Sequence, residues 1–151
     1  MIYLGIDPGL SGGLAAVDDQ GAVVFAVKMP VTERDLLEAL QPCAALDGPR
    51  ARAVLEKVHT MPKQGIVSAF TFGRGYGGLR MALTATRIPF DEVTPQKWQL
   101  VMGCRTHGEK NISKRRAQQL FPSVSVTHAL ADALLLAEFC RRCHVRVERS
   151  A

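Results

Sequence analysis

Residues 2–7 read Ile-Tyr-Leu-Gly-Ile-Asp and are followed directly by Pro8-Gly9. The short apolar run predicts a buried β-strand, and the Pro-Gly pair predicts the turn that ends it. Two more apolar runs follow at 14–17 and 22–29, separated by the turn-forming residues 18–21. Because both connections are short, we expect the first three strands to form an antiparallel meander.

Helices and strands alternate through the rest of the chain. The expected elements are a helix from Thr32 to about Ala45, a strand at 51–56, a helix at about 65–86, a strand at 90–93, a helix that begins at Thr94-Pro95, a loop at 102–110, a basic helix at 111–121 and a last helix from His128 to about Cys143. This order predicts an α/β fold in which one five-stranded mixed sheet, an antiparallel meander plus parallel strands, is flanked by helices. The length of 151 residues predicts one domain, residues 1–151.

Composition excludes several classes of protein. Hydrophobic residues make up 47% and charged residues 22% of the chain, a balance that argues against disordered and collagen-like chains. The apolar runs are shorter than the ~18 residues that a membrane span needs, and the chain does not begin with a signal-peptide pattern, so we expect a cytoplasmic protein. A net charge of +5 favours a polyanionic partner.

The cysteines do not predict a cofactor. Cys140 to His144 match the attachment pattern for c-type haem, but that chemistry needs export, so we expect no haem. Cys43 and Cys104 supply no second close pair for a tetrahedral zinc site. Reduced thiols in a cytosolic protein are the expectation.

Four residues are candidates for a catalytic site. Asp7 and Glu56 each end an apolar strand, and if the two strands are parallel neighbours their carboxylates lie at one edge of the sheet. His128 and Asp132 interrupt an otherwise apolar run four residues apart, which places them on one helical face. The alternatives are a turn cap for Asp7, a favourable interaction with the helix dipole for Asp132, and a hydrogen-bonded core histidine for His128.

A divalent cation between Asp7, Glu56 and Asp132 would compensate their charge. Oxygen ligands favour Mg²⁺ or Mn²⁺ over Zn²⁺. Two such ions could stabilise both the attacking water and the leaving oxygen during phosphodiester cleavage.

Five motifs, taken in order, cover nearly the whole chain. They are Leu4-Gly-Ile-Asp-Pro-Gly-Leu-Ser-Gly-Gly13, Leu55-Glu-Lys-Val-His59, Phe70-Thr-Phe-Gly-Arg-Gly-Tyr-Gly-Gly78, Val93-Thr-Pro-Gln-Lys-Trp98 and Leu130-Ala-Asp-Ala-Leu-Leu-Leu136. The ordered set resembles the RuvC-type Holliday junction resolvases of the ribonuclease H-like superfamily, and is most similar to their compact phage-type and organellar branch.

The resemblance implies a structure-selective endonuclease that acts as a homodimer on four-way DNA junctions and makes paired cuts with Mg²⁺ or Mn²⁺, two ions per active site. Asp7, Glu56 and Asp132 fall on the family's acidic positions. His128 stands where some members have a fourth carboxylate and others a histidine, which leaves the preferred metal open. A bacterial or phage-infected cell is the implied setting, with an organellar origin still open.

The resemblance also implies residues that contact DNA. His59 lies three residues after Glu56, where many relatives place an aromatic side chain that stacks at the junction centre; an inert surface histidine is the alternative. Arg74, Lys97, Lys110 and Lys114 are candidates for phosphate contacts, against the alternative of a solvated basic face.

Other functions remain open at this point. A related metal nuclease on flaps, other branched DNA or RNA/DNA hybrids, and a non-catalytic junction-binding relative, are alternatives. The first motif is also similar to the phosphate loop of actin-like ATPases and sugar kinases, but those enzymes need two domains and a longer chain.

The glycines between residues 73 and 78 have two interpretations. Glycine weakens a helix, so the segment is expected to be irregular or closely approached by another surface. Gly73 and Gly77 share a helical face, which fits either a dimer contact or tight packing on the protein's own sheet.

Overall fold

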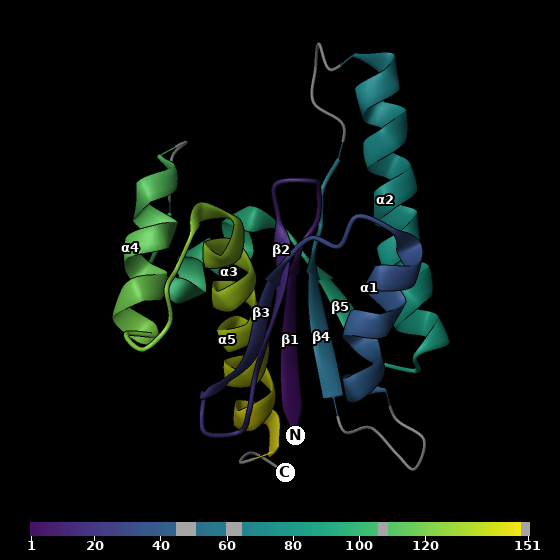
Figure 1. Cartoon of the computed structure of the whole chain (residues 1–151). Helices are drawn as coiled ribbons and strands as arrows, with labels where there is room; N and C mark the ends of the chain where they lie inside the picture. The colour runs from purple at the N-terminus through teal and green to yellow at the C-terminus, as the bar shows by residue number, and fades with distance from the viewer. Residues whose placement is uncertain (45–50, 60–64, 106–108, 149–151) are drawn as a thin grey trace.

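A computed structural model describes residues 1–44, 51–59, 65–105 and 109–148 (Figure 1). Its sheet has five strands in the order β3-β2-β1-β4-β5, with β1 antiparallel to β2 and parallel to β4. The strands are β1 Ile2–Asp7, β2 Gly13–Val17, β3 Val23–Lys28, β4 Ala51–Glu56 and β5 Phe90–Val93. The predicted mixed sheet, with its meander and parallel strands, is confirmed.

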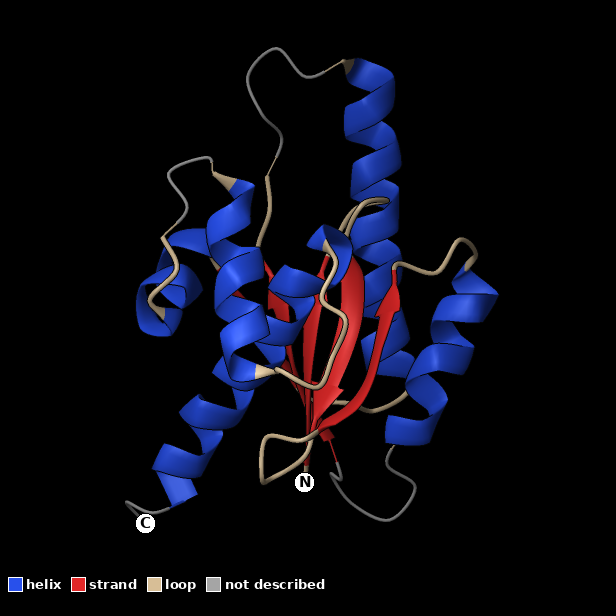
Figure 2. Cartoon of the chain, turned by 60° about the vertical axis from the view of Figure 1, so that its left-hand side comes forward, coloured by secondary structure: helices blue, strands red, loops and turns tan. Residues whose placement is uncertain are grey.

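Helices cover both faces of this sheet (Figure 2). They are α1 Glu33–Leu40, α2 Ile66–Ala85, α3 Pro95–Met102, α4 Lys110–Leu120 and α5 His128–Glu148, and a 3₁₀ turn, Gln41–Cys43, follows α1. The last helix, α5, packs across β1, β2 and β4, whereas α1 and α2 pack together over the opposite face. Among the described helices, none has the length and apolar character of a membrane span.

Three helix predictions need correction. The helix that begins after Thr32 ends at Leu40, because Pro42 lies in a tighter 3₁₀ turn; position 45 is outside the described residues. The helix α2 is continuous through its glycines, so the irregular-segment interpretation is wrong. The last helix continues to Glu148 rather than ending near Cys143.

The strands alternate between two separate cores. Tyr3 and Val54 face α5, whereas Leu4 and Leu55 face α1 and α2. By the same alternation, the residues that end β1 and β4 project on the α5 side of the sheet.

A glycine sets the distance between α5 and the sheet. A Cβ atom on Gly5 would lie 2.1 Å from the backbone nitrogen of Ala137 and 2.2 Å from the carbonyl oxygen of Ala133. The helix therefore crosses β1 in backbone contact, which only a residue without a side chain permits. This contact fixes how near the first turns of α5 come to the end of β1.

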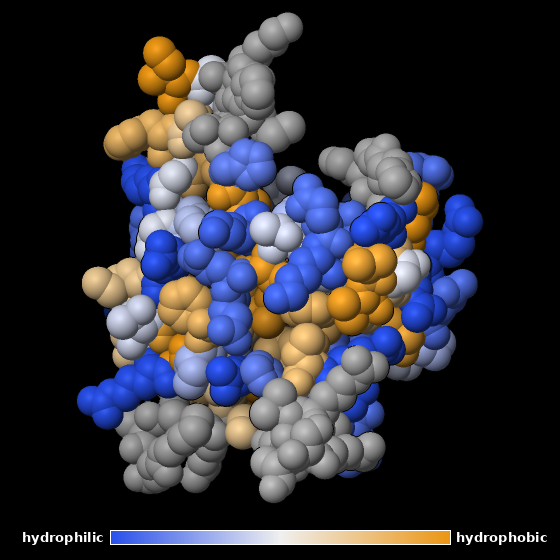
Figure 3. Space-filling view, turned by 180° about the vertical axis from the view of Figure 1, so that it is seen from behind, coloured by the Kyte–Doolittle hydropathy of each residue, from blue (hydrophilic) through white to orange (hydrophobic). Residues whose placement is uncertain are grey.

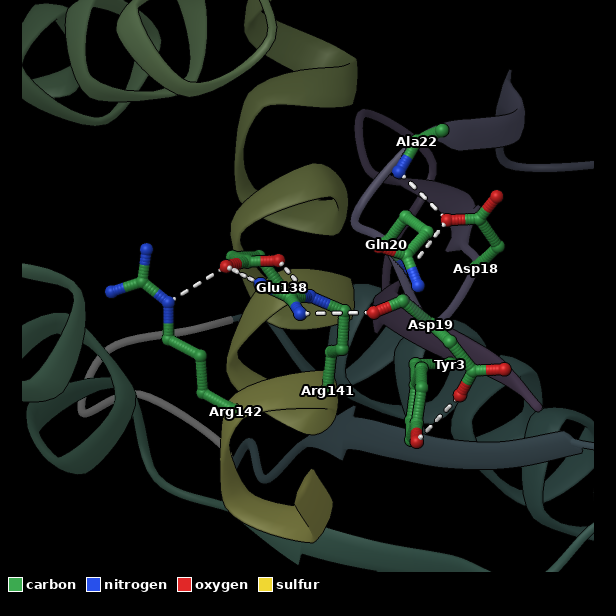
Figure 4. A network of polar contacts seen from close by, with 8 residues as sticks. All are labelled: Tyr3, Asp18, Asp19, Gln20, Ala22, Glu138, Arg141 and Arg142. Carbon is green, nitrogen blue, oxygen red and sulfur yellow. Dashed lines mark hydrogen bonds and ion pairs between the residues drawn. The ribbon is translucent and has the colours of Figure 1, made fainter. Parts of the chain in front are cut away.

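The other half of α5 is anchored by a buried glutamate (Figure 4). Glu138 is 5% exposed and accepts hydrogen bonds from Arg141 Nε and Nη2 at 2.8 Å and from Arg142 Nε at 2.7 Å. Arg141 also donates to the carbonyl oxygen of Asp19 in the turn between β2 and β3. Burial alone would raise the pKa of Glu138, but the two arginines outweigh it and hold the pKa below its usual value.

Candidate active site

Asp7 and Glu56 lie side by side at the carboxyl ends of β1 and β4. The two strands are parallel, and Ile6 is the partner of Leu55, so the next residue of each strand is a carboxylic acid. Both acids project on the α5 side of the sheet, as the alternation of the strands requires. The two strands are parallel neighbours, as predicted, so Asp7 and Glu56 stand at the same end of the sheet.

The first turns of α5 bring Asp132 to the same edge. Gly13, the partner of Asp7, has space for only a hydrogen atom because a Cβ there would lie 2.9 Å from the carbonyl oxygen of Ala129. Asp132 therefore starts the next turn of a helix that lies directly over the end of β1. Its side chain is half-buried, and its charge acts on Glu56.

The pKa of Glu56 is strongly perturbed. Burial raises its pKa, a hydrogen bond from Trp98 opposes the rise, and the charge of Asp132 adds to it, so that the pKa reaches about 7. Burial together with a neighbouring like charge is the arrangement that active sites use to perturb a carboxyl group. A bound cation would remove much of the free-energy cost of ionising Glu56 at this position.

The loop after β1 wraps around Asp7. The N–H of Gly12 donates to the carbonyl oxygen of Gly9, and a Cβ on Gly12 would lie 2.1 Å from the carbonyl oxygen of Asp7 and 3.1 Å from its carboxyl carbon. Gly9 has a φ of +105°, which glycine adopts without strain. The glycines of the first motif therefore shape the backbone around this carboxylate.

The histidine and the basic residues take different positions. His128 is the exposed first residue of α5, one turn before Asp132, and His59 is exposed beyond the end of β4. Lys97 is exposed in the first turn of α3, and Lys114 is half-buried on α4. The side chain of Lys110 is outside the described residues.

We call the end of the sheet that carries Asp7, Glu56 and Asp132 the acidic edge. The possible metal ligands there are carboxylate oxygens, which suit Mg²⁺ or Mn²⁺. Across the residues that the structure describes, no three His, Cys, Asp or Glu side chains are arranged closely enough to hold an ion. The ligand roles of Asp7, Glu56, Asp132 and His128 therefore stay predictions.

Sequence reasoning missed three neighbours of the acidic residues. Trp98 is completely buried and donates its indole Nε1–H to Oε1 of Glu56 at 2.8 Å. Cys104 is buried, and burial followed by the charge of Asp132 raises its thiol pKa to about 11, while Arg116 acts in the opposite direction. Trp98 belongs to a motif quoted above, but no spacing rule connects it with a residue 42 positions earlier.

A cavity of about 580 Å³ lies on the other side of this edge, between the loop after β1, the loop before α1, and α2. Its lining includes Gly9, Ser11, Thr32 and Arg74. Arg74, a predicted phosphate contact, therefore lines a cavity whose wall also includes Pro8, the residue directly after Asp7.

No family model matches the chain, and no curated protein matches it in sequence. Solved structures do match. The structure of Thermus thermophilus RuvC in complex with a Holliday junction substrate has a TM-score of 0.70 at 18% identity, over 97% of this chain and 96% of that chain. A second T. thermophilus RuvC structure has a TM-score of 0.65 at 20% identity, over 98% and 97%. The fold is therefore of the RuvC type along almost the whole chain.

Proposed function

We propose that this chain is a divalent-metal-dependent endodeoxyribonuclease that resolves four-way DNA junctions by paired cleavage. One observation carries the proposal: Glu56 is half-buried, ends the strand beside the one that ends in Asp7, and is repelled by Asp132, at one edge of a RuvC-type sheet. A protein that only binds DNA gains nothing from gathering carboxylates next to phosphates, because like charges repel.

Asp7, Glu56 and Asp132, with His128 as a fourth ligand, would hold Mg²⁺ or Mn²⁺. When bound, two such ions would supply an activated water and would stabilise the leaving oxygen of the phosphodiester. The protein's own contribution is to hold the carboxylates on rigid strands and a helix, where their mutual repulsion favours a bound cation.

Branched DNA is the proposed substrate. One of the structures with this fold is a complex with a Holliday junction substrate, and the net charge of +5 suits a polyanion. Lys97, Lys110, Lys114 and Arg74 are the proposed phosphate contacts, and His59 the residue nearest the junction centre.

A homodimer is part of the proposal, and α2 supports it. Only the second half of α2 contributes buried residues, and its first half extends past the sheet (Figure 1). Ile66, Val67 and Phe70 there are 88%, 79% and 73% exposed. Seen from behind, hydrophobic surface marks this free end (Figure 3). A two-fold dimer would place two identical sites around a junction that is itself close to two-fold symmetric.

The glycines of α2 favour the same conclusion. A Cβ on Gly73 or Gly77 would meet nothing within 4 Å. Tight packing on the protein's own sheet therefore does not explain these glycines. We propose that they allow close contact with the surface of a second copy of the chain.

Cleavage of defined substrates tests the function. The protein is incubated with a labelled four-way junction, a duplex, a flap and an RNA/DNA hybrid, each with Mg²⁺, with Mn²⁺ and with a chelator. We expect two symmetric cuts in the junction that need a divalent ion. Preferential cleavage of the flap or hybrid would establish the alternative nuclease, and binding without cleavage would establish the non-catalytic relative.

Asp7→Asn, Glu56→Gln and Asp132→Asn should each lower the cleavage rate by roughly 100-fold or more, while junction binding survives. Glu38→Gln is the matched control, because Glu38 is exposed on α1 and forms an ion pair with Arg34 one turn earlier in the same helix. His128→Asp should retain activity with an altered Mg²⁺/Mn²⁺ dependence, and His128→Ala should lose most of it.

Light scattering tests the dimer. Phe70→Glu should convert a dimer to a monomer because it places a charge on the free half of α2. Leu100→Glu, at an exposed position of α3, is the control and should leave the dimer intact. A monomer of the unmodified protein with and without junction DNA would refute the proposal.

A further inference from the structure

The only tryptophan of the chain, Trp98, lies in the core under α5. Trp98 belongs to the same core cluster of buried residues as Met102 and Phe139. The indole N–H is the single polar group of the side chain and can only donate. This N–H donates to Oε1 of Glu56, so the one polar atom of a fully buried side chain is hydrogen-bonded to a residue of the acidic edge.

The backbone around this contact is fixed from both sides. Glu56 is the register partner of Val93, and the N–H of Lys57 donates to the carbonyl oxygen of Val93 at 2.6 Å. Directly after Val93, the carbonyl oxygen of Thr94 accepts from the N–H groups of Lys97 and Trp98 and so starts α3. These backbone hydrogen bonds hold the end of β4 and the first turn of α3 together. The hydrogen bond from Trp98 to Glu56 joins the same two segments.

We propose that Trp98 is a positioning residue for Glu56: its indole N–H holds Oε1 in place and leaves Oε2 as the oxygen available to an ion or to substrate. This role rests on the proposed nuclease function. A glutamate side chain has three rotatable bonds, and a carboxylate that is to act as a ligand must be held in one orientation. The surrounding core keeps the indole itself from moving.

Because the chain has one tryptophan, a tryptophan analogue supplied during expression replaces position 98 alone. β-(Benzothienyl)alanine has nearly the shape of tryptophan but carries sulfur in place of the N–H. 5-Fluorotryptophan keeps the N–H and is the matched control. We expect the benzothienyl protein to lose about 10- to 100-fold in kcat, as outer-shell partners of ligands do, with little change in KM for the junction. The fluorinated protein should cleave at close to the normal rate.

Trp98→Phe is the genetic counterpart of this change, and Met102→Ala controls for lost packing. Met102 is buried in the same helix but is not the residue that bonds Glu56. Trp98→Phe should raise the concentration of Mg²⁺ needed for half-maximal rate, and Met102→Ala should lower the melting temperature without this effect. Equal metal dependence in the benzothienyl, Trp98→Phe and unmodified proteins would overturn the proposal.

A readout without activity separates this proposal from the proposed function. The indole N–H of Trp98 gives one resonance in a ¹H–¹⁵N spectrum of the full chain. Glu56→Gln should shift this resonance, and Mg²⁺ alone should shift it in the unmodified protein but not in Glu56→Gln. If these shifts occur but no substrate is cut, the nuclease function fails while the contact stands. If cleavage occurs but the resonance is insensitive to Glu56→Gln, the role of Trp98 is refuted.

Discussion

Two glutamates on the same side of the sheet, Glu138 buried and Glu56 half-buried, have opposite electrostatics. Glu138, on the second half of α5, is held by two arginines, and its pKa lies below the usual value. Glu56, at the end of β4, is half-buried near Asp132, and its pKa is raised to about 7. Among the residues that the structure describes, no ion pair joins Glu56 to a cationic side chain.

The difference separates a region built for stability from a region built for binding. A buried carboxylate that is paired and hydrogen-bonded supports the folded state, whereas one kept near a like charge is costly and is retained for another reason. The helix α5 belongs to both regions, since Asp132 and Glu138 lie on it.

The largest effect on stability is expected from Gly5→Ala, because it would displace α5, the helix that carries both Asp132 and Glu138. The added methyl group would meet the backbone of α5 at 2.1 Å, so the helix must move rather than a side chain. We expect a loss of more than about 3 kcal/mol in the free energy of unfolding, at or beyond the upper end for overpacking. Chemical denaturation measures this loss, and a stability close to that of the unmodified protein would show that α5 does not rest on β1 at Gly5.

Gly73→Ala is the matched control for that experiment. Gly73 lies in open space within α2 of the single chain, so in the monomeric Phe70→Glu background alanine should stabilise the protein by about 1 kcal/mol through its helix propensity. In the dimer, where a second surface is proposed to cover this part of α2, the same substitution should lose this gain.

The next largest effect is expected from Glu138→Gln. The amide leaves two arginines without their carboxylate, which should cost about 3 kcal/mol at neutral pH, while cleavage per folded molecule stays unchanged. Because the pKa of Glu138 is lowered on folding, its stabilisation is present above the unfolded value and is lost as the pH falls through the folded value. The difference between variant and unmodified protein, measured by denaturation across acid pH, should therefore shrink toward low pH.

The strands, the helix and the acidic residues of both regions can be predicted from the sequence, but the partners of those acids cannot. Apolar runs that end in Asp7 and Glu56, and a helix that carries Asp132, follow from local pattern, so strands and acids were placed correctly. The partners of the acids, Trp98 for Glu56 and Arg141 and Arg142 for Glu138, depend on packing. The arginine pairs have helical spacing, yet only the burial of Glu138 makes them strong.

Glu56→Gln should show the opposite pH dependence from Glu138→Gln. The raised pKa of Glu56 means that its stabilisation is complete below about pH 4.5 and is lost as the pH rises through about 7. Glutamine does not titrate and still offers an oxygen to Trp98. In buffer without divalent ions, the variant should therefore be more stable than the unmodified protein by up to roughly 3 kcal/mol at pH 8.5, with no gain at pH 4. A gain that is independent of pH would mean that Glu56 is ionised throughout.

The smallest effect concerns the cations at the two ends of the sheet. Lys97 is exposed in the first turn of α3, beside the acidic edge, whereas Arg87 lies after α2 and before the start of β5, at the opposite end. If Lys97 contacts a phosphate, Lys97→Ala should weaken junction binding only a few-fold and reduce the slope of log K against log salt by about 0.9.

Arg87→Asn removes a cation at the other end and leaves that slope unchanged; asparagine tolerates the φ of +55° that Arg87 adopts. Binding titrations at several salt concentrations, made with a chelator so that no DNA is cut, measure both slopes. Equal slopes for the two variants would return Lys97 to a solvated basic face. They would also mean that the end of the molecule with Asp7, Glu56 and Asp132 does not meet the DNA backbone through α3.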